Sequence, residues 1–470
     1  MPTESNKARL IILADMDNEP DEEQQMVHML MCSNMFHLDG LIAVTGKYLR
    51  TKPVPELFHH LLDGYDMVLP NLKLHAGGWH ETHYLRSITH AGQQNYGMDD
   101  VGDGKSSPGS NQIVAALTND DPRPVYVVIN AGSNTLAQAL WDVRANHTPA
   151  EMEAIVAKLR VFENGAQDNA GAWICSTFPN VHWMRSNFQT YAFGGPEKDG
   201  GSHFGLGPYT WEPYAYSALG QHHWDLEHVI AFHGPLGARF PLRLFERTGR
   251  LLFKEGGGTT PWLGLLNRGL FDPDRPWWGG WSGRFSRQKI ENYWSRHADV
   301  HADEEKHAPF YVYGEASDRW IDPETNTLWD GICVPVWRWR RAMFNNQKCR
   351  MDWCVKPYAE ANHHPQAVLN GVADDVITMV GAEPGETIAL DASGSSDPDG
   401  DPLAFRWWVY GEAGTYAGDV EIPDADAVGT SVTIPEDAAG TEIHVILEAR
   451  DKNPIGSLFD YRRMVINVSS

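Results

Sequence analysis

The stretch of sequence that decides the fold runs from residue 10 to residue 22 and reads Leu10-Ile11-Ile12-Leu13-Ala14-Asp15-Met16-Asp17-Asn18-Glu19-Pro20-Asp21-Glu22. It opens with an apolar run, which predicts a buried strand. Crowded carboxylates follow at once, and their mutual repulsion is costly unless a cation lies among them. Ca²⁺ is the simplest such cation because it accepts many oxygen ligands in flexible geometry. The alternative is a solvated acidic loop ahead of a helix that begins near Asp21.

The spacing of these acids resembles that of a known enzyme family. The pattern Asp-x-Asp-x-x-x-Asp-(Asp/Glu) after an apolar strand resembles the signature of the inosine-uridine-type nucleoside hydrolases. The resemblance implies that Asp17 binds calcium and activates the attacking water, that Glu22 is a further calcium ligand, and that Asp21 holds ribose hydroxyls. Asp15 is expected to join the metal site. Calcium lowers the pKa of its bound water, so a carboxylate can remove the proton before an oxocarbenium-like sugar is attacked.

Two further strand ends fit the same family. Residues 125–137 predict a strand, a glycine turn and a helix start, and the resemblance implies a backbone carbonyl ligand to calcium near Ala131. Residues 38–46 predict a buried strand that ends in glycine. Lys47 follows it, about where the family has a sugar-binding asparagine, and is therefore a candidate substrate contact.

More distant stretches resemble a narrower group, the bacterial proteins called cellulose-binding, which have a nucleoside-hydrolase-like domain. These stretches are residues 162–174, 233–237, 337–340 and 350–353. Together with the tail, the resemblance covers nearly the whole chain. It implies an α/β domain over residues 1–360, built on an open, mostly parallel sheet flanked by helices. A smaller all-β, immunoglobulin-like sandwich is expected over residues 361–470.

One departure from the family concerns the metal site. The nucleoside hydrolases carry an Asp just before a late helix, but here residues 255–261 read Glu-Gly-Gly-Gly-Thr-Thr-Pro. The ligand in place of that Asp is either a neutral oxygen of Thr259 or Thr260, or the carboxylate of Glu255. Otherwise calcium binds weakly or not at all. Losing one anionic ligand lowers calcium affinity, because affinity follows ligand charge and site rigidity.

Composition excludes several classes of function. The chain of 470 residues has no apolar run long enough for a membrane span. A formal net charge of −24 argues against nucleic acid polymers as partners. The five cysteines show no metal-binding spacing, and buried thiols are the expectation for all of them, although Cys349 and Cys354 could form a bridge. Neither a phosphate-binding P-loop nor a serine-hydrolase elbow is present.

The tail is strongly acidic and its pattern is that of β structure. Residues 366–470 contain 19 acidic and 5 basic residues, and short strand-like runs alternate with turn-rich spacers. Residues 390–401 resemble PKD-type, immunoglobulin-like modules of extracellular carbohydrate enzymes. This segment contains three acids, Asp397, Asp399 and Asp401. They either hold a structural calcium or form an acidic turn without metal.

Aromatic and polar residues beyond the acidic stretch are candidate sugar contacts. Two adjacent tryptophans, Trp277 and Trp278, lie in a long loop. Their rings either stack on sugar rings or pack the loop against the core. Asn164, Asp168 and Asn169 follow a strand-like run, where crowded polar groups favour recognition of sugar hydroxyls.

His233 ends another strand-like run and is a candidate proton donor to a leaving group. A satisfied structural histidine is the alternative there.

These features predict a glycosyl hydrolase that uses a calcium-bound water and Asp17 as base on a ribosyl or related glycoside of plant or microbial carbohydrate. The alternative is a non-catalytic carbohydrate (cellulose)-binding protein whose nucleoside hydrolase site has decayed, as Lys47 and the missing late Asp suggest.

The resemblance also implies possible homo-oligomers. It favours an extracellular or periplasmic protein whose signal peptide is absent from this sequence, with a cytoplasmic location as the alternative.

Overall fold

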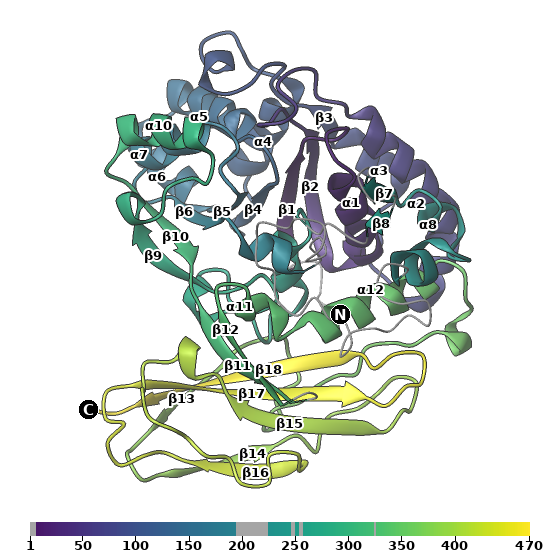
Figure 1. Ribbon diagram of the computed structural model, residues 1–470, viewed down its shortest axis with the longest axis vertical. Coiled ribbons are helices and arrows are strands. Elements are labelled where there is room, and N and C mark those ends of the chain that lie inside the picture. The colour runs from purple at the N-terminus through teal and green to yellow at the C-terminus, as the bar shows by residue number, and fades with distance from the viewer. Residues whose placement is uncertain (1–5, 194–223, 246–249, 253–256, 324–325) are drawn as a thin grey trace.

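The computed structural model describes residues 6–193, 224–245, 250–252, 257–323 and 326–470. Its larger part is built on an eight-stranded sheet with the strand order β3-β2-β1-β4-β5-β6-β10-β9 (Figure 1). Neighbouring strands run parallel except for the antiparallel pair β10 and β9. The strands are β1 (Ala8–Ala14), β2 (Phe36–Ala43), β3 (Thr89–Ala91), β4 (Val125–Ile129), β5 (Leu159–Asn164), β6 (His182–Ser186), β9 (Phe285–Lys289) and β10 (Tyr311–Glu315).

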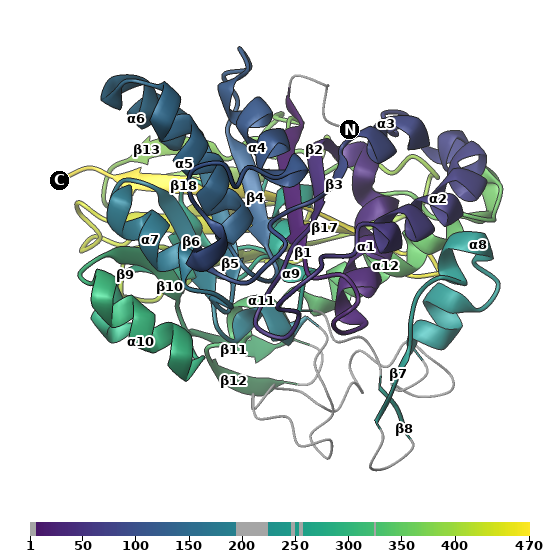
Figure 2. The same cartoon turned by 90° about the horizontal axis from the view of Figure 1, so that it is seen from above.

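Strand β1 is apolar throughout because both faces of the sheet are covered. Leu10 and Ile12 belong to one hydrophobic cluster, whereas Ile11 and Leu13 belong to another, as the alternation of side chains along a strand requires. Helices lie on both faces of the sheet (Figure 2). The open parallel sheet predicted from residues 10–14 is therefore confirmed.

The helices that cover the sheet follow its strands along the chain. Within the described residues, no helix combines the length and the apolar character needed to cross a bilayer. The α-helices are α1 (Asp21–Cys32), α2 (Glu56–His75), α3 (Thr82–Ser87), α4 (Pro108–Thr118), α5 (Asn134–Asn146), α6 (Pro149–Ala157), α7 (Ala170–Thr177), α8 (Gly234–Gly237), α9 (Thr260–Leu263), α10 (Ala298–His307), α11 (Val334–Trp337) and α12 (Arg340–Asp352).

The chain changes direction across the sheet between β1 and β4. It builds β1, β2 and β3 towards one edge, then crosses back to place β4 on the other side of β1 and continues with β5 and β6. Open α/β sheets bind ligands at such a switch point, outside the carboxyl ends of the strands. Asp15 follows β1 and Asn130 follows β4, so both residues lie at this point.

The tail forms the predicted all-β part. One sheet has the order β13-β18-β17-β15, and β14 pairs with β16 separately. Their apolar side chains form a core of their own around Trp407, Val445 and Ile466. The strands are β13 (Thr378–Ala382), β14 (Thr387–Asp391), β15 (Leu403–Val409), β16 (Gly429–Thr433), β17 (Glu442–Asp451) and β18 (Phe459–Val468).

The two parts share apolar contacts rather than a loose linker. Trp339 packs on Trp408, Tyr410 and Tyr461, with ring centroids 5.3–6.2 Å apart. These tyrosines belong to the same hydrophobic cluster as one face of the parallel sheet. A hairpin of β11 (Asp318–Asp322) and β12 (Thr327–Gly331) adds an ion-pair and hydrogen-bond network, because Asp318 accepts a hydrogen bond from the Tyr410 hydroxyl at 2.6 Å.

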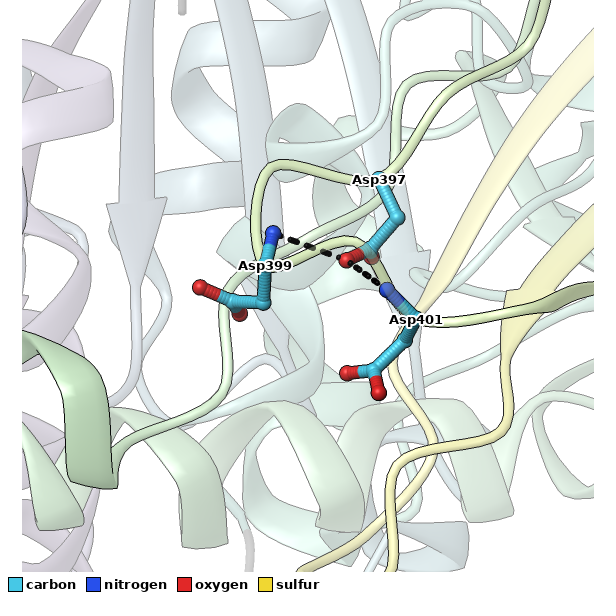
Figure 3. Close-up of side chains that lie close together, drawn as sticks. All are labelled: Asp397, Asp399 and Asp401. Atoms are coloured by element: carbon cyan, nitrogen blue, oxygen red, sulfur yellow. Dashed lines mark hydrogen bonds between the residues drawn. The ribbon is translucent and has the colours of Figure 1, made fainter.

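The acidic turn of the tail is held by its own backbone. Asp397 Oδ1 accepts hydrogen bonds from the backbone N–H groups of Asp399 and Asp401 at 2.9 and 3.0 Å (Figure 3). The three side chains each offer an oxygen within 4.8 Å of the others. The Asp399 carboxylate also accepts a hydrogen bond from the backbone N–H of His363. A structural calcium in this turn remains a prediction.

All five cysteines are buried and free, as expected of structural thiols. The possible bridge between Cys349 and Cys354 is not formed. Burial raises the pKa of both thiols well above the ordinary value, so they remain protonated and unreactive.

We expect protonation of His444 to lower the free energy of unfolding in acid. This side chain is fully buried where the two parts meet. Burial lowers the pKa of His444 to about 4, and the Arg463 guanidinium adds to the shift. Because the folded pKa lies below the unfolded value near 6.5, this stabilisation is complete above about pH 6.5 and is lost as the pH falls towards 4. The loss at about pH 5 should be about 2 kcal/mol.

Urea unfolding of the wild type and a His444→Gln variant at neutral pH and at about pH 5 measures this effect. The difference between the two proteins should change by about 2 kcal/mol across that interval. Identical pH dependence of both proteins would show that His444 is not the group responsible.

Candidate functional site

Four loops meet at the carboxyl edge of the sheet around Gly46. A Cβ built on Gly46 would lie 3.0 Å from Asp15 Oδ2, 2.9 Å from Ala131 Cβ and 3.1 Å from Gln167 Oε1. These neighbours follow β1, β4 and β5, and Gly46 itself follows β2. The parallel strands thus bring together residues that are far apart in the sequence, and only a glycine fits among them.

Two carboxylates of the acidic stretch are buried at this edge. Asp15 and Glu22 are each 2% exposed. Burial raises the pKa of the Asp15 carboxyl to about 8, and the carboxylates of Glu19 and Glu23 add to the shift. Burial also raises the pKa of Glu22 well above its ordinary value, with further increases from Asp21 and Asp15. The edge therefore holds two carboxyl groups whose anionic form is disfavoured unless a cation or hydrogen-bond donor stabilises it.

Buried oxygen atoms at this edge lack hydrogen-bond partners. Within the described residues, Asp15 Oδ2, Asn130 Oδ1 and Asn164 Oδ1 have none. The amide nitrogens of both asparagines are already used, since Asn130 Nδ2 donates to Glu22 at 3.1 Å and Asn164 Nδ2 donates to the Gly257 carbonyl at 2.9 Å. A buried acceptor without a donor is costly, so a ligand that supplies positive charge or hydrogen bonds fits here. Oxygen-only donors suit calcium.

The predicted three-acid metal set is arranged differently. Asp17 is exposed and lies at a positive φ of 82° in the turn that follows Asp15. In the described part of the chain, three acids close enough to share one cation are found at the turn of the tail, not at Asp15, Asp17 and Glu22. The roles of Asp17 as base and of Glu22 as ligand stay predictions.

Two glycines occupy the space beside the acids where a late Asp was expected. A Cβ on Gly257 would lie 2.7 Å from Asp21 Oδ2, and one on Gly258 would lie 2.5 Å from Asn130 Nδ2. The backbone approaches so closely that neither position accepts an aspartate without displacing its neighbours.

The residues proposed to replace that aspartate have different positions. Thr259 is buried at the start of α9, and the Thr260 hydroxyl donates to the Thr190 carbonyl at 2.9 Å. Thr259 as a ligand stays a prediction. The Thr260 hydroxyl, by contrast, already donates a hydrogen bond to a backbone carbonyl. Glu255 lies outside the described residues.

Asp168 and Asn169 have structural partners, and their prediction as sugar contacts is not tested by these contacts. The Asp168 carboxylate accepts hydrogen bonds from the backbone N–H groups of Asn134 and Ala170, both at 3.0 Å, and so binds the N-termini of α5 and α7. Negative charge at helix N-termini is stabilising. Asn169 accepts from the Met98 backbone and donates to Asp303.

His233, the predicted proton donor, is held by a carboxylate, and its catalytic role stays a prediction. It is 8% exposed, and its Nε2 lies 3.2 Å from Asp352 Oδ1 at the end of α12. His233 also directly precedes α8, and a Cβ built on Gly237 would lie 2.9 Å from the His233 Cβ. The contact with Asp352 gives this histidine a structural partner.

The two adjacent tryptophans have different environments. Trp278 is 1% exposed, donates a hydrogen bond to Glu442 at 3.0 Å and packs edge-on against His444, so its prediction as a sugar contact is wrong. Its neighbour Trp277 is 38% exposed and stacks on Tyr313. The two rings thus lie on different sides of the short 3-10 helix Pro276–Trp278, and the tail covers one of those sides.

Lys47 lies at the carboxyl edge but is engaged by a charge. Its ammonium group binds Asp299 on α10, and its backbone N–H donates to Gln167 Oε1 at 3.3 Å. Asp299 also binds Arg50 at 3.3 Å. The lysine thus connects the loop after β2 to α10, and any contact with substrate requires this ion pair to rearrange.

Asn130 was not among the residues predicted from the sequence, although its neighbour Ala131 was. The signal was present, because Asn130 directly follows β4 at the switch point. Tyr191 and Arg296, whose side chains bind each other beside Asp21, were not predicted either. Burial raises the pKa of Tyr191 to about 12, partly offset by Arg296. No local pattern marks these two residues, since the sequence separates them by more than a hundred positions.

Solved structures resemble this chain over different shares of its length. A nucleoside hydrolase-related hypothetical protein from Saccharophagus degradans, associated with carbohydrate metabolism, is 35% identical, with 99% of this chain and 100% of that chain covered and a TM-score of 0.82. The effector protein XOO4466 is 10% identical over 73% of this chain and 94% of its own, with a TM-score of 0.33. The titin M3 domain is 15% identical over 23% of this chain and 97% of its own, with a TM-score of 0.15.

Two family models match the sequence, and no curated protein matches it. The nucleoside hydrolase-like domain of cellulose-binding Sde182 matches residues 9–285, and the C-terminal domain of cellulose-binding protein Sde0182 matches residues 387–468. The first match spans more than half of the chain, and the similarity to the Saccharophagus protein spans nearly all of it. The chain therefore belongs to the nucleoside hydrolase-like, cellulose-binding Sde182 family.

Proposed function

We propose that this protein binds carbohydrate at the carboxyl edge of its parallel sheet, without cleaving it. The observation that carries the proposal is the group of buried acceptors at Asp15, Asn130 and Asn164 that have no donor within the described residues. Sugar hydroxyls supply donors, and a calcium ion would supply positive charge to the same oxygens. The family's cellulose-binding name supports a polysaccharide as the source of the sugar, and an extracellular location would bring the protein to it.

Binding is favoured over hydrolysis because parts expected of a nucleoside hydrolase site have other tasks. His233 pairs with Asp352, and Lys47 pairs with Asp299. An aspartate at Gly257 or Gly258 would have to displace the side chain of Asp21 or Asn130. Binding needs only acceptors and donors in place, whereas hydrolysis also needs a base and a positioned water.

Calcium-assisted hydrolysis of a glycoside is the second candidate. It is favoured by the burial of Asp15 and Glu22 together, because two carboxylates in a desolvated position are stabilised when a cation joins them. Calcium held there by Asp15, Glu22 and the two asparagine oxygens would acidify a bound water. Asp17 is exposed beside them and would accept its proton.

Calorimetric titration with cellohexaose tests the binding proposal. Asn164→Ala and Asp21→Asn should each weaken binding about tenfold, since each removes one hydrogen-bonding group. Matched controls are Asn111→Ala and Asp66→Asn, which change exposed residues on α4 and α2. Unchanged affinity in both site variants would contradict the proposal. Release of reducing sugar by the wild type that is lost in Asp17→Asn would instead support hydrolysis.

A further inference from the structure

The opposite, amino edge of the sheet is hollowed by two adjoining cavities. The larger, of about 400 Å³, lies between the ends of α5, α6 and α7 and is lined in part by Met152 and Phe178. The smaller, of about 120 Å³, lies at the start of β6 and β10. Pro179 and Asn180 line both cavities, so the two share one wall.

Aromatic rings continue from the smaller cavity along β10. Tyr311 and Tyr313 both line it, and their spacing of two places them on the same face of the strand. Trp277 stacks on Tyr313 with a centroid distance of 6.1 Å and an interplanar angle of 29°. Trp277 and Tyr311 are 38% and 48% exposed. We call Trp277, Tyr311 and Tyr313 the aromatic row.

The groups that border the aromatic row are polar, and their charges are mostly balanced. The Arg287 guanidinium lies 4.9 Å above the Tyr311 ring and carries donors that no described carboxylate occupies. Arg160 binds Asp274, and Lys289 binds Glu291 at 2.9 Å. Exposed rings beside hydrogen-bonding groups, with most charges paired, match a neutral amphipathic ligand.

We infer that the aromatic row and the adjoining cavities bind a neutral, β-linked glucan chain, at a site separate from the carboxyl edge. In such a chain the hydroxyls are equatorial, so each ring presents C–H groups on its faces and hydroxyls at its rim. The faces stack on Trp277 and Tyr311, and the hydroxyls are within the reach of Asn180 and Arg287 side chains that line the smaller cavity. This inference rests on the proposed carbohydrate-binding function.

The two sites lie at opposite ends of the parallel strands. Pro179 and Asn180 precede β6, whereas Asp15, Asn130 and Asn164 lie at the carboxyl ends of β1, β4 and β5. A strand of five residues spans roughly 16 Å, so one sugar ring cannot contact both ends. Substitutions at one site should therefore leave binding at the other unchanged.

Titration of the full chain with cellohexaose tests the inference. In an Asp21→Asn/Asn164→Ala background, which impairs the carboxyl edge, Trp277→Ala and Tyr311→Ala should each weaken the remaining binding about tenfold. Tyr311→Phe keeps the ring and should stay within about twofold of its background. Tyr358→Ala, at an aromatic residue that is 40% exposed outside both sites, is the matched control. Thermal unfolding verifies that each variant is folded.

The outcomes separate this inference from the proposed function. Loss of binding in the row variants supports glucan binding at the aromatic row. If the carboxyl-edge substitutions alone have no effect on binding, only the proposed site at that edge is refuted. Complete loss in the edge variants, with row variants unchanged, overturns the aromatic row and leaves the proposed function intact. Absence of any binding by the wild type overturns both.

Discussion

Replacing Asp15 by Asn together with Glu22 by Gln is expected to weaken calcium binding at the carboxyl edge at least about 100-fold. Both carboxylates are buried, and burial raises both pKa values, so each is poorly stabilised as an anion without a cation. Among the buried ligand oxygens, removing both charges leaves the neutral amide oxygens of Asn130 and Asn164. Affinity for calcium follows the number of charged ligands.

Calorimetry and the shift of the thermal midpoint with added calcium measure this effect. At a calcium concentration 100 times the dissociation constant, the ion should stabilise the wild type by about 2.7 kcal/mol and the double variant hardly at all. Both proteins should carry Asp397→Asn, so that the acidic turn of the tail does not contribute. Asp66→Asn is the surface control. Equal calcium response in the presence and absence of the two carboxylates would refute the edge as a calcium site.

Arg185→Met is expected to lower the free energy of unfolding by about 4 kcal/mol. The Arg185 side chain is wholly buried between two carboxylates, with its Nε 2.6 Å from Glu163 Oε2 and an Nη1 hydrogen bond to Glu304. Burial disfavours the guanidinium charge, but Glu163 and Glu304 more than offset this and raise the pKa of Arg185. Without Arg185, two buried carboxylates remain without their cation, and α10 loses an attachment to the sheet.

Chemical denaturation of the variant measures the loss. Lys306→Met is the control on the same helix, because its pairing with Asp303 is exposed and should contribute less than about 1 kcal/mol. Adding Glu163→Gln and Glu304→Gln to Arg185→Met should recover much of the stability, since no buried charge is then left uncompensated. A loss for Arg185→Met as small as that for Lys306→Met would show that the carboxylates are stabilised in another way.

The parallel sheet was predictable because local pattern and global fold agree there. Residues 10–14 are apolar without alternation, which is typical of a strand with both faces covered, and the two clusters on either side of β1 confirm it. The place of Asp15 and Asn164 was predictable for a related reason. Parallel strands bring their carboxyl ends to one edge, so polar residues directly after strands meet there.

The partners of the predicted site residues were not predictable from local pattern. Asp168 and Asn164 both belong to the polar end of β5, yet Asp168 binds two helix N-termini whereas Asn164 keeps a buried oxygen without a described donor. His233 follows an apolar run, as a site residue would, but Leu226–Ile230 of that stretch form a short helix rather than a strand of the sheet. A sequence pattern specifies where a residue lies along an element, not which distant side chain it contacts.

The sequence by itself determined the architecture and the acidic edge, because apolar periodicity and strand ends are local properties of the chain. Only the tertiary structure decided which carboxylates are buried, which tryptophan the tail covers and which ion pair engages Lys47. That last contact joins residues 252 positions apart. Burial and long-range pairing depend on what packs against a residue, and packing is a property of the folded chain as a whole.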